Sequence, residues 1–312
     1  RKQGIIRMGQ FLGVDTSNYT TSLAVSNAGK ITQNLKTVLK VEEGQRGLRQ
    51  SDAVFAHTVN LPLLFENLGK NIFSAVGVSA YPRDVAGSYM PCFLAGISSA
   101  SAISSVNGIP LYRFSHQAGH IAAALYSCEK EALIHGEFLA FHVSGGTTEL
   151  LHVKNMEISL LGGTKDISAG KVVDRTGVLL GLHFPCGKEL EILAGDAVYT
   201  VKPAKICVNG FDCNMSGIEN KVQKLLLCGA DRQYVAAYVI SFITAAIDKM
   251  TENALSVYSG LPVIYSGGVM SNRYINKTLS DKYGGYFAKP EYSCDNAAGI
   301  ARLTEMKFTG EI

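Results

Sequence analysis

The chain has 312 residues, of which 47% are hydrophobic and 18% are charged, and 29 Lys and Arg against 26 Asp and Glu leave a net charge of +3. So many apolar and so few charged residues exclude an intrinsically disordered chain, and the length predicts about two domains. The near-neutral balance provides no bulk field for binding nucleic acid or an anionic membrane.

Residues 1–10 are basic and lack the apolar core of a signal peptide. We interpret them as a leader or tag remnant that precedes a natural start near Met8. The seven cysteines include no CxxC pair, which argues against a disulfide framework and a zinc ribbon and favours a reducing cytosol. The longest apolar stretch, residues 234–247, is too short to span a bilayer. We therefore expect a cytoplasmic protein without a membrane partner.

Residues 11–23 and 138–150 form an internal repeat at a constant offset of 127 residues. Phe, Leu, Ser, Thr, Thr and Leu coincide between the two segments without a gap. Each copy consists of an apolar run, a turn of small polar residues and a second β-prone run, which is the pattern of a tight hairpin. The repeat predicts two related domains.

Four further short strands are predicted, two behind each hairpin, at residues 31–38, 75–78, 156–161 and 262–265. Helices between the strands indicate an α/β fold with mixed sheets. A duplicated α/β unit that opens with such a hairpin is typical of the actin-like fold (ASKHA, ribonuclease H-like), whose two domains flank a central cleft. A chance resemblance between two hairpins is the alternative. We expect one domain at residues 11–115, completed by a C-terminal helix at residues 297–312, and a second at residues 116–296.

His116 and His120 lie four residues apart in a predicted helix, so both imidazoles project from one face and can share a metal ion. An ordinary pair of surface histidines is the alternative. His142 occupies the place in the second hairpin that Asp15 has in the first, and Asp295 lies near the C-terminus. These two residues could complete a two-His-one-carboxylate or three-His-one-carboxylate set for zinc or iron(II).

Two other chemistries are not expected. Gln117 stands where a zinc protease of the HExxH type carries its general base, which argues against proteolysis through this helix. Residues 181–188 have the wrong spacing for a Walker A loop, and Glu189 stands where Ser or Thr is needed. Nucleotide binding would instead use glycine pairs of the actin-like kind, in the loop at residues 144–148 and in the strand, turn and helix of residues 263–272.

Six groups of residues, in this order, resemble the TsaD family of tRNA threonylcarbamoyladenosine transferases, long known as O-sialoglycoprotein endopeptidases or glycoproteases. They are Asp15-Thr16-Ser17, His116 with His120, Val143-Ser144-Gly145-Gly146, Asp174 with residues 184–187, Gly267-Gly268 with Asn272, and Asp295-Asn296-Ala297. The resemblance covers the chain from Phe11 to about Leu303. It implies a catalytic metal in the cleft and transfer of a threonylcarbamoyl group from its adenylate to the exocyclic amine of the adenosine next to the anticodon in tRNA.

The resemblance also assigns site residues, and none of them is assigned as catalytic beyond the metal site. His116, His120 and Asp295 fall on the family's metal ligands, and His142 falls where some members have a metal-binding Tyr. The adenylate-binding positions are Val143, Ser144, Gly145, Gly146, Asp174, Gly187, Glu191 and Asn272. The implied cofactors are one divalent ion, iron or zinc, per subunit and an adenine nucleotide, either the adenylate donor or ATP or AMP.

Some of these assignments have physical reasons and some have alternatives. Asp174 and Glu191 suit ribose hydroxyls, because a carboxylate accepts hydrogen bonds from both. A surface position for Asp174 and a helix N-cap for Asn272 are the alternatives. The loop Asp15-Thr16-Ser17 is the candidate phosphate loop.

The chain departs from the family pattern in the loops around these positions. Where the family reads Glu-Thr-Ser-Cys-Asp-Glu, residues 15–20 lack the last two carboxylates. Residues 81–84 replace a Gly-Pro-Gly stretch, Glu219 replaces a Lys, and Asp166 alone survives of a doubled Asp. These departures predict a divergent paralogue.

Three functions therefore compete. The first is metal-dependent threonylcarbamoyl transfer to tRNA, or carbamoyl transfer to another acceptor. The second is a non-catalytic adenine-nucleotide-binding scaffold, and the third, a metallo-glycoprotease, is disfavoured. A net charge of +3 supplies few phosphate contacts, so we expect partner proteins to help present tRNA. A homodimer, or a heterodimer with a related actin-like protein, is also expected.

Overall fold

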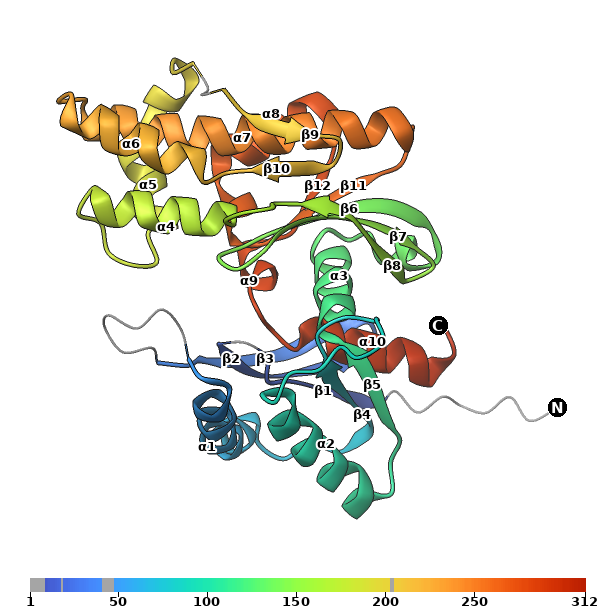
Figure 1. Ribbon diagram of the computed structural model, residues 1–312. Coiled ribbons are helices and arrows are strands. Elements are labelled where there is room, and N and C mark those ends of the chain that lie inside the picture. Colours follow the sequence, from blue (N-terminus) through green and yellow to red (C-terminus); the bar gives the residue numbers. More distant parts are fainter. Residues whose placement is uncertain (1–8, 18, 41–47, 203–204) are drawn as a thin grey trace. The chain divides into compact units, whose positions relative to one another are not determined.

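The computed structural model describes residues 9–17, 19–40, 48–202 and 205–312, and their contacts form two units (Figure 1). Unit 1 comprises the residues up to Glu131 together with Asp295–Ile312, and unit 2 comprises Ala132–Cys294. The boundaries differ from the predicted ones, because the helix that begins at His116 packs within unit 1 against the C-terminal helix. Most of the predicted leader lies outside the described residues, and Gln10 already begins the first strand.

Unit 1 is a mixed sheet with helices on both faces (Figure 1). Its elements are β1 (Gln10–Asp15), β2 (Thr20–Asn27), β3 (Lys30–Val38), α1 (Gln50–Leu68), β4 (Phe73–Tyr81), α2 (Phe93–Asn107), β5 (Leu111–Ser115), α3 (His116–Ser127) and α10 (Ala298–Thr309). The strand order is β3-β2-β1-β4-β5. The first three strands are antiparallel, as the hairpin predicted, and β4 and β5 run parallel to β1.

Alternate residues of β1 face the two helical layers. Leu12 and Val14 are fully buried in a core that includes residues of α1 and α2. On the other face, a Cβ at Gly13 would lie 2.5 Å from the backbone of Ala297 and Ala301. Only glycine allows this approach, so α10 packs directly on β1 and its N-terminus lies close to the strand.

A buried ion-pair network holds α10 in place at Arg302, which is 5% exposed. Its guanidinium donates to Glu131 Oε1 at 2.7 Å and to Ser26 Oγ at 3.1 Å, and it also contacts Glu305. Glu305 in turn accepts from the backbone N–H of Gly29 at 2.9 Å. The network therefore ties the C-terminal helix to the β2–β3 turn and to the last residue of unit 1 before the chain enters unit 2.

Unit 2 repeats the sheet order of unit 1 in a second five-stranded sheet, β12-β11-β6-β7-β8. Its strands are β6 (Glu137–Val143), β7 (Thr148–Lys154), β8 (Glu157–Gly163), β9 (Cys207–Asn209), β10 (Asp212–Asn214), β11 (Val263–Ser266) and β12 (Tyr286–Phe287). Its helices are α4 (Ala169–Leu179), α5 (Gly187–Ala194), α6 (Gly217–Leu227), α7 (Arg232–Val257), α8 (Arg273–Tyr283) and α9 (Pro290–Ser293), with short 3-10 turns at Gly195–Tyr199 and Gly268–Ser271. A further 3-10 turn, Glu131–His135, begins at the last residue of unit 1 and continues into unit 2. β6 and β7 confirm the second predicted hairpin.

The core of unit 2 is built around α7, which contains the apolar stretch predicted as a buried helix. Val235, Ile243 and Ile247 are completely buried, in one cluster with Leu139 and Phe141 of β6. Among the described residues, α7 alone is long and apolar enough to cross a membrane, and 72% of its most apolar window is buried inside the protein. This burial is typical of a core helix.

Candidate functional site

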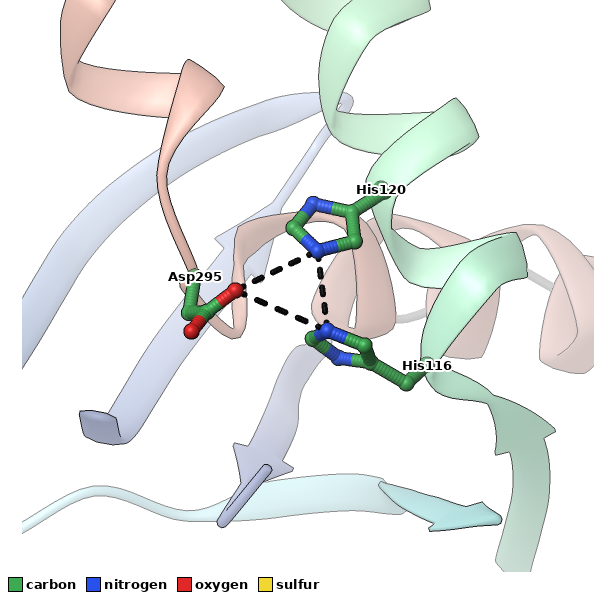
Figure 2. A group of neighbouring side chains, drawn as sticks. All are labelled: His116, His120 and Asp295. Atoms are coloured by element: carbon green, nitrogen blue, oxygen red, sulfur yellow. Dashed lines mark hydrogen bonds and ion pairs between the residues drawn. The ribbon is translucent and has the colours of Figure 1, made fainter. Parts of the chain in front are cut away.

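The histidine pair lies at the start of α3 in unit 1 (Figure 2). Ser115 caps this helix by accepting from the backbone N–H of Ala118, so α3 begins at His116. His120 follows one turn later, and the Nε2 atoms of the two rings are 2.8 Å apart. The structure thus confirms that both imidazoles share one helix face.

Asp295 reaches the same point from the segment before α10 (Figure 2). Its Oδ1 lies 3.6 Å from His116 Nε2 and 3.3 Å from His120 Nε2. The helices come close enough for this because they cross at two glycines: a Cβ on Gly299 of α10 would lie 1.9 Å from the carbonyl oxygen of Gly119 in α3.

The three side chains fit the requirements of a metal site. The ligand atoms of His116, His120 and Asp295 all lie within 4.8 Å of one another, and they form the one such group found among the described residues. Two ligands of one ion, each at the usual distance of about 2.1 Å, can be at most about 4.2 Å apart. The three separations between these atoms are all shorter than this. Two imidazole nitrogens and one carboxylate oxygen suit zinc or iron(II).

The charges at this point favour a protonated His116. Burial lowers the pKa of His116, but the carboxylates of Asp15 and Asp295 raise it more, to about 10. Burial raises the pKa of Asp295, and the hydrogen bonds to His116 and His120 more than reverse this, so the pKa of this carboxyl is well below its usual range. A metal ion that binds at neutral pH would therefore displace a proton from His116.

Asp15, predicted as part of a phosphate loop, contacts His116. Its Oδ2 accepts a hydrogen bond from His116 Nδ1 at 2.9 Å, and its Oδ1 accepts one from the backbone N–H of Ser17 at 2.7 Å. Thr16 donates its hydroxyl to the carbonyl of Cys92 at 3.0 Å. The sequence analysis missed the Asp15–His116 contact, and the role of this loop toward phosphate stays a prediction.

In unit 2 the predicted glycine loop lies between β6 and β7. Ser144 donates its N–H to the carbonyl of Thr147 at 2.8 Å, which closes a tight turn. No atom lies within 4 Å of a Cβ built on Gly145 or Gly146. The hydroxyl of Ser168, the N-cap of α4, donates to the carbonyl of Gly145 at 2.6 Å. The turn thus sits over the N-terminus of a helix with room for a ligand beside its backbone.

The other predicted nucleotide residues of unit 2 have protein partners. Asp174 accepts from the N–H of Cys186 at 2.9 Å, and burial raises the pKa of Asp174 despite this bond. Glu191 accepts from the N–H of Arg273 at 3.1 Å. Asn272 is the N-cap of α8, where its Oδ1 accepts two backbone N–H groups, as its alternative interpretation predicted. Gly187 begins α5. Nucleotide binding by these residues stays a prediction.

His142 is the second-to-last residue of β6 in unit 2, opposite Ser266 of β11. Its Nδ1 lies 3.4 Å from the Ser266 hydroxyl. The clustered ligands His116, His120 and Asp295 all belong to unit 1. The role of His142 as a fourth ligand therefore stays a prediction.

Three residues in the segments where the chain departs from the family pattern have structural roles. Asp84 accepts from the hydroxyl of Ser115 at 2.5 Å and so supports the cap of α3. Glu219 pairs with Arg175 at 2.7 Å. Asp166 accepts several hydrogen bonds from the segment before α6; burial opposes them, but they hold the pKa of this carboxyl well below its usual range.

Two units with the same strand order, each opened by the same hairpin, define this chain as an actin-like protein, and its first unit carries a cluster of two histidines and one aspartate. The family model described as "tRNA N6-adenosine threonylcarbamoyltransferase" matches residues 57–302. The chain therefore belongs to the TsaD family. The matched region contains His116, His120 and Asp295, whereas Asp15 precedes it.

Similar proteins agree with this assignment. A tRNA N6-adenosine threonylcarbamoyltransferase of Thermosipho melanesiensis is 29% identical, with 96% of this chain and 95% of the relative covered. One of Geobacillus thermodenitrificans is also 29% identical, over 93% of this chain and 89% of the relative. Among solved structures, nucleotide-bound HypF has a TM-score of 0.59 at 12% identity, covering 96% of this chain and 56% of HypF. Component A of the (R)-2-hydroxyglutaryl-CoA dehydratase of Acidaminococcus fermentans has a TM-score of 0.58 at 16% identity, over 96% and 99% of the two chains. These structures show the fold alone, whereas the relatives support a transferase that acts in tRNA processing.

Proposed function

We propose that this protein transfers a threonylcarbamoyl group from threonylcarbamoyl-adenylate to an adenosine of tRNA, and that it does so with one divalent ion held by His116, His120 and Asp295. The observation that carries this proposal is the cluster of these three ligands in a chain of the TsaD family. Iron and zinc both suit two nitrogens and one carboxylate oxygen.

In this reaction the exocyclic amine attacks the carbamoyl carbon, a C–N bond forms, and the bond to the adenylate phosphate breaks with release of AMP. When bound, a divalent ion supplies a Lewis acid that polarises an oxygen and stabilises the developing charge. His116 and His120 are held for this role by the first turn of α3, whose N-cap is Ser115. Asp295 adds a negative charge that favours a cation at this point.

The adenylate is proposed to bind in unit 2. The open turn at Gly145 and Gly146 exposes backbone to an anion, and the N-terminus of α4 directly behind it carries a positive partial charge. Asp174 and Glu191 are the candidate acceptors for the ribose hydroxyls. A ribose at Glu191 would have to share this carboxylate with Arg273.

The chain itself has little excess positive charge with which to bind a tRNA acceptor, because its net charge is only +3. Neutralising a run of tRNA phosphates needs several Lys and Arg at the interface. We therefore propose that partner proteins share in binding tRNA. We also propose that the protein works in the cytoplasm, as a homodimer or with a related actin-like protein.

The test combines metal analysis with complementation. The purified protein should hold one ion per chain by elemental analysis, and His120→Ala should lose it. His183→Ala is the matched control, because His183 is an exposed histidine of unit 2 whose side chain is 91% exposed. In a strain depleted of its own threonylcarbamoyl transferase, the wild type and His183→Ala should restore threonylcarbamoyladenosine in tRNA, and His120→Ala should not.

The outcomes separate the alternatives. A folded, metal-loaded wild type that restores no modified nucleoside would refute transfer to tRNA and favour another acceptor. A wild type that binds adenine nucleotide but no metal would favour the non-catalytic scaffold. Full modification by a metal-free His120→Ala protein would refute the role of the metal.

A further inference from the structure

One buried carboxylate, that of Asp15, lies next to the histidine pair but is not one of the three clustered ligands. Its burial at this point is also not explained by packing in the hydrophobic core. Asp15 ends β1 and is 1% exposed. Its Oδ2 lies 2.9 Å from Nδ1 of His116, the ring atom on the opposite side from the metal-facing Nε2. Because an ionised carboxylate only accepts hydrogen bonds, this contact requires that the proton of His116 stays on Nδ1.

We propose that Asp15 is a positioning residue, which orients the His116 ring and fixes the proton on Nδ1 so that Nε2 is directed at the metal. This inference rests on the metal site of the proposed function. Histidines that bind metals commonly donate their other N–H to a carboxylate, which sets the ring orientation and makes the ligand more basic. Asp15 stands in that relation to His116 and makes no contact with Nε2.

The backbone around Asp15 fixes the carboxylate in this direction. β1 is held on one side by β2 and on the other by β4, and Oδ1 accepts from the N–H of Ser17 at 2.7 Å. Both oxygens thus have protein partners. His116 follows directly after β5, which runs parallel to β1 with β4 between them, so the ends of the two strands lie at one edge of the sheet.

The same contacts argue against the phosphate loop as the role of Asp15. A carboxylate beside a phosphate repels it, whereas an imidazole N–H attracts a carboxylate. His116 is also fixed by Phe93, whose ring meets the imidazole edge-on at 6.2 Å between centroids. The ring is therefore held by an aromatic contact on one side and by the Asp15 hydrogen bond at Nδ1.

The experiment measures zinc affinity and the tautomer of His116. Zinc binding to the purified full chain is measured by competition with a chromogenic chelator, for the wild type, Asp15→Asn and Asp15→Ala. Loss of the second carboxylate is expected to weaken binding by about 10- to 100-fold, with a smaller loss in Asp15→Asn, which keeps a neutral acceptor. Asp52→Asn, an exposed carboxylate of α1 in the same unit, is the matched control and should bind as the wild type does.

The tautomer is read from ¹⁵N NMR of the zinc-bound, histidine-labelled wild type, with the His116 signals assigned by their absence in His116→Ala. We expect a protonated Nδ1 and a zinc-bound Nε2. This measurement needs no Asp15 variant, so it decides the matter even if both variants fail to fold. Zinc on Nδ1 of His116 would overturn the inference, and so would folded Asp15 variants with wild-type affinity. A wild type that binds no zinc or iron would instead refute the metal site of the proposed function.

Discussion

The crossing of α3 and α10 makes a specific prediction for Gly299→Ala. The added methyl carbon would lie 1.9 Å from the carbonyl oxygen of Gly119 and 2.7 Å from the backbone nitrogen of Ala123. Both atoms belong to the backbone of α3, so no side-chain rotation can relieve the clash. An ordinary contact needs about 3.5 Å, so the two helices must separate by roughly 1.5 Å at this point.

The energetic cost follows from this displacement. Overpacking a well-packed site costs about 1–3 kcal/mol, and a clash with backbone belongs at the upper end of that range. Replacing glycine by alanine inside a helix gains about 1 kcal/mol of helix propensity. We therefore expect Gly299→Ala to lower the free energy of unfolding by about 2 kcal/mol. Because Asp295 and His120 lie on the two sides of this crossing, zinc affinity should fall as well.

Urea unfolding of the metal-free protein measures the first effect, and chelator competition measures the second. Gly217→Ala is the matched control, because a Cβ at Gly217 of α6 meets no atom within 4 Å, and this variant should be as stable as the wild type or slightly more so. If Gly299→Ala is as stable as the wild type and binds zinc equally well, the close crossing does not hold the ligands together.

Three further predictions concern unit 1. Arg302→Ala leaves Glu305 buried without its cation and should cost about 3–5 kcal/mol in urea unfolding, whereas Arg273→Ala, with a side chain 95% exposed, should cost less than about 0.5 kcal/mol; equal effects would contradict the network. Ser115→Ala removes the N-cap of α3 and should lower the free energy of unfolding by about 1 kcal/mol, which thermal unfolding would show as a lower Tm. Since the pKa of His116 is raised from 6.5 to about 10, its contribution to the stability of the metal-free protein is complete below pH 6.5 and lost as the pH rises toward 10; an identical pH profile in His116→Ala would refute this.

The fold class could be predicted from the sequence because the chain contains an internal duplication. The matching hairpins at residues 11–23 and 138–150 predicted β1–β2 and β6–β7, and alternation of strands and helices predicted the mixed sheets. The spacing of His116 and His120 likewise predicted one helix face, since residues four apart are neighbours on any helix. These features are local, and local spacing is visible in a sequence.

The domain boundary and the closeness of Asp295 could not be predicted in the same way. Both depend on the packing of α10 against α3, which rests on Gly119 and Gly299, residues 180 positions apart in the chain. Glycine has a low helix propensity, so a glycine in either segment argues against a helix and does not indicate a close crossing. Neither segment carries a sequence pattern that identifies the other as its packing partner. The sequence offers Asp295 as a candidate carboxylate ligand and the resemblance assigns it, and the packing of α10 against α3 is the physical reason why it lies beside the histidines.

Asp15 and His142 show that the internal repeat predicts the position of a side chain but not its interaction partner. They occupy equivalent places near the end of the first strand of each unit. Asp15 is the last residue of β1, opposite Ser22 in β2, and His142 is the second-to-last residue of β6, opposite Glu149 in β7. The repeat correctly predicts that both are polar residues at the same edge of a sheet. It does not predict their partners, because these come from other strands: Asp15 contacts His116 beyond β5, across β4, whereas His142 contacts Ser266 of the adjacent β11. A duplicated backbone therefore fixes the position of a side chain at the sheet edge, and the residues that the other strands and the segments after them place beside it determine its chemistry.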